Sequence, residues 1–132
     1  MSKARSLLLG VALATLGLVG CGSDEPSSAP ADCTRVEGGE VTLVARNLQW
    51  NLDCLRVTAG TEVTFTVRLE DEGVKHDLEV YGDGVERVKT PLESGPATQT
   101  LQVPFPKPGT SSFVCTIHAQ MEGDIFAEQP AR

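Results

Sequence analysis

The sequence predicts an all-β protein, a two-sheet antiparallel Greek-key sandwich of seven or eight strands. Three observations predict it. From residue 39 onward apolar and polar residues alternate, clusters of Gly and Pro recur at short intervals, and no stretch repeats apolar residues at helical spacing. Residues 33–132 are enough for one hydrophobic core, so a single domain is expected there.

The alternation is clearest over residues 61–69, where Val63, Phe65 and Val67 fall on one face and threonines on the other. Further strands are expected at 40–45, 54–57, 74–81, 98–103, 111–116 and 123–128. Residues 82–96 contain Gly, Pro and Ser and are expected to form a long connection with little regular structure. Prolines at 104, 106 and 108 should end the strand before them. Trp50 and Phe65 are expected in the core.

Residues 1–20 predict a lipoprotein signal peptide. Lys3 and Arg5 precede an apolar run over residues 7–20, too short for a membrane-spanning helix but suited to a secretory signal. The run ends in Leu-Val-Gly-Cys, which resembles the bacterial lipobox and implies a lipid on Cys21. The residues that follow are polar and rich in Pro and Ser, which is typical of a flexible tether. Residues 21–32 are therefore expected to be the lipidated cysteine and its tether. We therefore expect a protein exported to the cell envelope and lipid-anchored to a bacterial membrane.

The chain is acidic, with 18 acidic and 11 basic residues and a formal charge of −7. Two of the basic residues lie in the expected signal peptide and none of the acidic ones do, so the mature charge would be −9. This charge argues against nucleic acid and against adhesion to anionic lipid. It is compatible with a protein partner that has a basic docking face, or with an acidic surface that only keeps the domain soluble.

The four cysteines have different expected fates in an oxidising compartment. Cys21 would carry lipid, and Cys33 and Cys54 can pair, tying the start of the domain to its second strand. Cys115 is left over, and it is either reactive, intermolecular or metal-bound.

The neighbours of Cys115 favour metal. Cys115, His118 and Met121 follow one another at intervals of three residues, where one expected strand ends and the last begins. His76, in an earlier strand, can add a second imidazole. Two imidazoles, a thiolate and a thioether form a soft to borderline donor set that suits copper. Zinc could enter the same site, but it would leave the methionine unexplained.

The whole pattern resembles the cupredoxin family. The Cys-x2-His-x2-Met spacing matches the short ligand loop of amicyanins, and the resemblance extends over about residues 39–128. It implies one type 1 copper ion held by His76, Cys115, His118 and Met121, which alternates between Cu(I) and Cu(II). It also implies that His118 is the electron port, with Ile117 and Ala119 as candidates for an apolar patch around it. The Cys33–Cys54 pair is similar to a bridge in some exported relatives.

Two residues depart from the family pattern. Ile117 stands where relatives often have Pro, and Asp77 stands where most have Asn. In relatives that Asn bonds the hydroxyl residue after the Cys, so Asp77 and Thr116 are expected to form the same tie. A carboxylate there favours Cu(II) over Cu(I), and we therefore hypothesise that Asp77 lowers the reduction potential.

The leading function is one-electron transfer between redox partners by a monomer. The alternatives are copper delivery with redox incidental, and a metal-free adhesion or scaffold sandwich, for which Cys115→Ala would have no effect. An enzyme is not expected, because metal would occupy both histidines and no general base of the usual type remains. A binuclear copper centre needs a second loop cysteine, and haem c attachment needs Cys-x-x-Cys-His; neither is present.

Overall fold

The computed structural model describes residue 20 and residues 28–131. Residues 1–19 of the expected signal peptide and the expected lipidation site Cys21 lie outside the described residues. Within the described part of the chain, no helix has the length and apolar character needed to cross a membrane.

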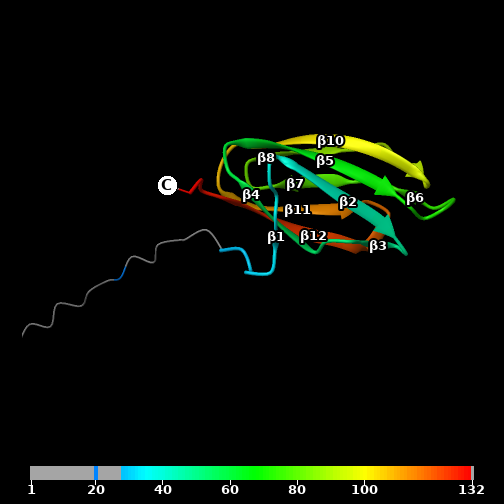
Figure 1. The fold of residues 1–132 in the computed structure, drawn as a ribbon, viewed down its shortest axis with the longest axis horizontal. Helices are drawn as coiled ribbons and strands as arrows, with labels where there is room; N and C mark the ends of the chain where they lie inside the picture. Colours follow the sequence, from blue (N-terminus) through cyan, green and yellow to red (C-terminus); the bar gives the residue numbers. More distant parts are fainter. Residues whose placement is uncertain (1–19, 21–27, 132) are drawn as a thin grey trace, which may run out of the picture.

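Strands make up two main sheets that face each other, as Figure 1 shows. The larger sheet has, in spatial order, β1 (Thr34–Arg35), β4 (Cys54–Thr58), β12 (His118–Glu128), β11 (Gly109–Cys115), β7 (Glu79–Gly82) and β8 (Val85–Lys89). The smaller sheet has β10 (Ala97–Phe105), β5 (Thr61–Leu69), β2 (Glu40–Arg46) and β3 (Gln49–Trp50). A short ribbon pairs β6 (Lys75–His76) with β9 (Glu93–Ser94). The all-β two-sheet class is confirmed.

The core lies between the two sheets. On β5 the alternation predicted from sequence is confirmed, because Val63, Phe65 and Val67 are buried while the threonines between them are half-exposed. Trp50 and Phe65 are both core residues, as expected. Each fully buried large side chain contributes about 1.5–3 kcal/mol relative to an exposed one, so this alternation provides much of the force that closes the sandwich.

The sandwich, expected to be antiparallel, also contains parallel strand pairs. β2 pairs in parallel with β5, β4 in parallel with β12, and β1 in parallel with β4. The chain leaves the smaller sheet after β3, passes through β4 in the larger sheet and returns as β5. Such a crossover delivers β5 beside β2 in the same direction, as parallel pairing requires.

The strand expected over residues 74–81 is two strands, because the pairing is interrupted at Asp77 and Leu78. Both of these side chains are buried, and the backbone N–H of Leu78 bonds the hydroxyl of Thr90 instead of a strand partner. The expectation of little regular structure over 82–96 is also wrong, since β8 and β9 lie there. Their sequences alternate too weakly to mark them as strands.

The strand that ends the smaller sheet continues through Pro104 to Phe105, beyond the expected stop. In the described part of the chain β10 is an edge strand that pairs with β5, and Pro104 lies opposite Glu62. A proline is tolerated on an edge because its missing N–H can face away from the partner strand.

A disulfide joins Cys33 to Cys54, as expected. It closes a separation of 21 residues between the chain before β1 and the start of β4. On the loop-entropy model, such a closure stabilises the fold by about 3 kcal/mol. Cys115 is the free cysteine of the described residues, and it is buried.

Candidate metal centre

Three different elements supply the expected ligands at one end of the sandwich. His76 ends β6, Cys115 ends β11, and His118 begins β12, with Met121 further along β12. The pairing of β11 with β12 steps from Val114 opposite Glu122 to Cys115 opposite His118. This register shift bypasses residues 119–121 and forms the short ligand loop, so the bulge brings Cys115 and His118 together.

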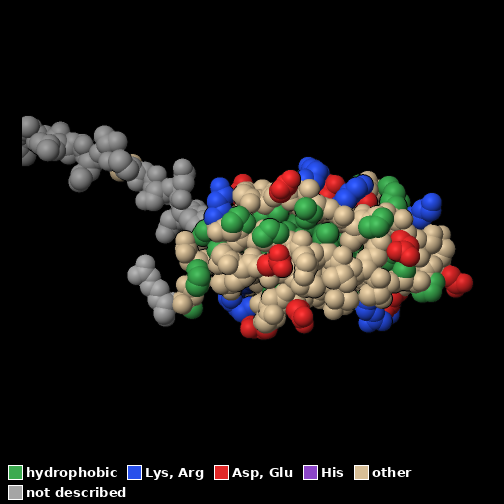
Figure 2. All heavy atoms as spheres, turned by 90° about the horizontal axis from the view of Figure 1, so that it is seen from above, with side chains coloured by type: hydrophobic (Ala, Val, Ile, Leu, Met, Phe, Trp, Pro, Cys, Tyr) green, Lys and Arg blue, Asp and Glu red, His purple; other side chains and the backbone are tan. Residues whose placement is uncertain are grey.

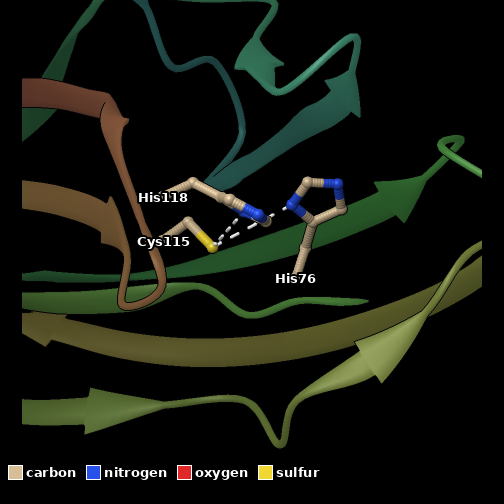
Figure 3. A group of neighbouring side chains, drawn as sticks. All are labelled: His76, Cys115 and His118. Atoms are coloured by element: carbon tan, nitrogen blue, oxygen red, sulfur yellow. Dashed lines mark hydrogen bonds between the residues drawn. The ribbon is translucent and has the colours of Figure 1, made fainter. Parts of the chain in front are cut away.

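The donor atoms of His76, Cys115 and His118 all lie within 4.8 Å of one another. Cys115 Sγ is 3.5 Å from His118 Nδ1 and 3.9 Å from His76 Nδ1, and Figure 3 shows the two rings converging on the sulfur. His76 and Cys115 are buried, while His118 is partly exposed. The structure thus brings His76 to the residues of the ligand loop, as the sequence predicts.

Met121 is buried, with 1% of its surface exposed. Its backbone carbonyl accepts a hydrogen bond of 3.2 Å from the indole Nε1 of Trp50. Trp50 also packs edge-on against Phe113, with ring centroids 6.4 Å apart. The loop carrying Met121 is therefore fixed to the core through a tryptophan for which sequence analysis gave only a packing role.

The tie expected between Asp77 and Thr116 is present. Thr116 donates its backbone N–H to Asp77 Oδ1 at 2.7 Å and its hydroxyl to Oδ2 at 2.6 Å. Asp77 is fully buried, and the Lys89 ammonium lies 3.9 Å from Oδ2. Since Asp77 follows His76 and Thr116 follows Cys115, the two bonds join the two ligand segments.

A second carboxylate, which sequence analysis missed, lies on the other side of His76. Asp71 Oδ2 is 2.9 Å from His76 Nε2, the ring nitrogen that faces away from Cys115. Burial acts to raise the pKa of Asp71, but the N–H groups of Leu48 and Asn47 and the His76 ring outweigh it and lower the pKa. Asp71 lies in an irregular connection with no motif around it, so no pattern marked it.

The donor set fits one copper ion. Two imidazole nitrogens and one cysteine sulfur converge, and the strand that begins at His118 also carries the buried Met121. Soft sulfur with imidazole is the combination that copper prefers. The His76 ring bonds Asp71, and Thr116, which follows Cys115, bonds Asp77, so both ligand segments are held in place. The site is closed on the side of His76 and reaches the surface at His118.

Comparison with known proteins supports this assignment. Amicyanin-alpha from Methylorubrum extorquens is 31% identical over 130 residues, which cover 94% of this chain and 99% of that protein. The chain belongs to the cupredoxin family. The reduced auracyanin of Roseiflexus castenholzii superimposes with a TM-score of 0.61 and 17% identity, over 68% of this chain and 97% of that one. Auracyanin A of Chloroflexus aurantiacus, a blue copper protein, superimposes with a TM-score of 0.59 and 17% identity. The match covers 71% of this chain and 99% of that one. No protein-family model matches the chain.

As a cupredoxin similar to amicyanin-alpha, the chain has a single type 1 copper site with a His-Cys-His-Met ligand set. It is a copper protein and not an enzyme. This assignment disfavours zinc in the same site and a metal-free sandwich, because the family and the converging donor atoms both indicate copper.

Proposed function

We propose that this cupredoxin carries single electrons between protein redox partners at the cell envelope. The observation that carries the proposal is the convergence of the donor atoms of His76, Cys115 and His118, which lie within 4.8 Å of one another. Copper bound there would supply one-electron chemistry. The chain's own part is to hold His76, Cys115, His118 and Met121 in nearly fixed places.

Rigidity at the ligands favours fast electron exchange, because little has to move when the charge changes. Two bonds join Asp77 to Thr116, one bond joins Trp50 to the backbone of Met121, and Asp71 holds His76. Burial of Cys115 excludes water and competing ligands from the thiolate. These features support a carrier that keeps its metal, and they disfavour copper delivery as the main role.

His118 is proposed as the electron port. Its ring is partly exposed, and its neighbours in the ligand loop, Ile117 and Ala119, are both exposed. Half of the surface of Ile117 is accessible, although a large aliphatic side chain is normally covered. Both residues therefore suit the apolar patch implied by the family resemblance.

Two further apolar side chains border the same end of the molecule. In the described part of the chain, the exposed large hydrophobic residues are Leu48, Leu92 and Ile117. The backbone N–H of Leu48 bonds Asp71, the partner of His76, and Leu92 precedes Glu93, which pairs with His76 in the short ribbon. We name these three side chains the apolar rim and propose that it is the docking surface.

The expected charge pairing with a basic partner is supported by the excess of acidic residues in the whole chain. On the face in Figure 2, acidic and basic side chains are mixed, with hydrophobic side chains between them. Steering would therefore come from the overall negative charge, whereas the docking contact would come from the apolar rim.

Export and anchoring remain part of the proposal. A signal peptide over 1–20, a lipid on Cys21 and a tether over 21–32 would hold the domain of residues 33–132 close to a membrane. The protein would act as a monomer, with the membrane touched only through the lipid.

Electron self-exchange of the copper-loaded protein tests the function. Wild type should exchange quickly between its Cu(I) and Cu(II) forms, and Ile117→Glu should slow this by about tenfold, because a charge in the apolar rim costs about 1.4 kcal/mol or more to bring into contact. Gln102→Glu is the matched control, since it adds the same charge at an exposed position on β10, outside the ligand segments. Equal rates for the two variants would refute the port at His118. Slow wild-type exchange with rapid release of Cu(I) to a chelator would favour copper delivery instead.

The reduction potential should rise in Asp77→Asn. Asparagine can keep both bonds to Thr116, because its oxygen accepts from the N–H and its amide donates to the hydroxyl, so mainly the charge is lost. Lys89 already offsets part of this charge, and we expect a rise of up to about 59 mV, one tenfold step for a one-electron couple. Voltammetry checks this, and an unchanged or lower potential contradicts it.

A further inference from the structure

We infer that Asp71 is a positioning residue for the copper ligand His76, which it fixes in one tautomer and whose bond to Cu(II) it strengthens. The inference rests on the copper site and not on the carrier role, so it holds whether the protein passes on electrons or copper.

The Asp71 carboxylate is surrounded by two backbone N–H groups and one ring nitrogen. Oδ1 lies 2.6 Å from the backbone nitrogen of Asn47, while Oδ2 lies 3.0 Å from that of Leu48 and 2.9 Å from His76 Nε2. The Asp71 side chain is only 12% exposed and the His76 ring is completely buried. Water therefore cannot readily replace any of these partners.

The two backbone donors come from a strained turn. Asn47 and Leu48 join β2 to β3 and have φ angles of 54° and 58°, in the left-handed region that costs a residue such as Leu about 1–2 kcal/mol. Both N–H groups point to the same carboxylate. Asp71 thus connects this turn of the smaller sheet to the metal ligand His76. The two N–H groups of the turn also hold the carboxylate in place.

The two backbone donors favour an ionised aspartate at this position, since each of them bonds a different carboxylate oxygen. A carboxylate accepts at both oxygens, whereas asparagine has one oxygen and an amide that only donates. In Asp71→Asn, the amide would face the backbone N–H of either Asn47 or Leu48. No orientation of the asparagine accepts from both of these donors.

The same geometry fixes the state of the His76 ring. A carboxylate cannot donate, so the hydrogen in the bond to Asp71 belongs to Nε2. The neutral ring then has its lone pair on Nδ1, the atom 3.9 Å from Cys115 Sγ. Asp71 therefore leaves the correct nitrogen free for copper before any metal binds.

The negative charge also has a consequence for the metal. A carboxylate bonded to the far side of a ligand imidazole makes the ring a stronger donor. A stronger donor and a nearby negative charge both stabilise Cu(II) more than Cu(I), so Asp71 lowers the reduction potential. Asp77 acts through the segment of Cys115, whereas Asp71 acts directly on the His76 ring.

Two measurements on the full copper-loaded protein test the role. In Asp71→Asn, affinity for Cu(II) should fall 10- to 100-fold, the usual cost of losing such a partner, and affinity for Cu(I) should fall less. If the affinity for Cu(II) falls tenfold more than the affinity for Cu(I), the reduction potential rises by about 59 mV. Glu72→Gln is the matched control, because it removes the same charge from the adjacent, exposed position, and its potential should stay near that of wild type. Equal potentials in the two variants would overturn the inference.

Nitrogen NMR of the wild-type apo-protein provides a readout that does not depend on the variant's folding. The His76 ring should carry its hydrogen on Nε2, with Nδ1 unprotonated. A hydrogen on Nδ1, or a mixture of tautomers, would overturn the role of Asp71 even if Asp71→Asn fails to fold.

Discussion

Replacing Gly123 with alanine should destabilise the folded protein by about 3 kcal/mol or more. A Cβ at this position would lie 2.5 Å from Phe113 Cε1 and 2.6 Å from the carbonyl oxygen of Asp53, and it would collide with Phe113 Cζ as well. Phe113 is completely buried, so its ring has no open space into which to move. Denaturant unfolding of the apo-protein measures the loss.

The matched control for this prediction is Gly60→Ala. Gly60 has a φ of +81° and no atom near its would-be Cβ, so alanine there costs only the left-handed backbone, about 1–2 kcal/mol. Gly123→Ala should cost clearly more than Gly60→Ala. A loss within about 1 kcal/mol of wild type would show that the core at Phe113 is looser than the structure indicates.

Gly123→Ala should also weaken copper binding. Gly123 lies opposite Phe113 in the pairing of β12 with β11, close to the register shift that forms the ligand loop. Phe113 also packs against Trp50, which bonds the backbone of Met121. A variant that still folds is therefore expected to bind copper more weakly than wild type.

Cys115→Ser should lose the strong visible absorption of the copper form and most of the copper affinity. A hydroxyl is a poor ligand for Cu(I) and gives no thiolate-to-copper charge transfer. We expect the affinity to fall by more than about 100-fold, beyond what the loss of an outer-shell partner costs. Serine is smaller than cysteine and can bond the histidine rings, so the fold should persist. Absorption spectra and competition titration measure both effects.

The double variant Cys33→Ser/Cys54→Ser is the control for sulfur content. It removes the disulfide, which lies apart from the ligand set, and leaves Cys115 in place. It should be less stable but keep its colour. If Cys115→Ser stays blue, or if the double variant turns colourless, the assigned thiolate ligand is wrong.

The copper ligands could be predicted because their chemistry is visible in sequence. Cys115, His118 and Met121 lie within one loop at a characteristic spacing, and His76 was the one histidine left to join them. The Asp77–Thr116 tie was predictable for the same reason, since each residue adjoins a ligand. Strand alternation likewise predicted β5 and its buried face.

Features that depend on contacts between distant segments could not be predicted. The bond between Asp71 and His76 forms because the connection after β5 lies against the β2–β3 turn, and no local sequence pattern predicts that contact. The parallel pairing of β2 with β5 follows from the crossover through β4, which alternation does not reveal. Pro104 looked like a stop because its edge position is a property of the sheet and not of the strand.

The most direct test of the copper site is the visible and electron paramagnetic resonance spectrum of the wild-type protein loaded with Cu(II). We predict one copper per chain and an intense thiolate-to-copper absorption, which one-electron reduction bleaches and reoxidation restores. A protein that binds one copper per chain and remains colourless would contradict the assignment of Cys115, His76 and His118 as its ligands.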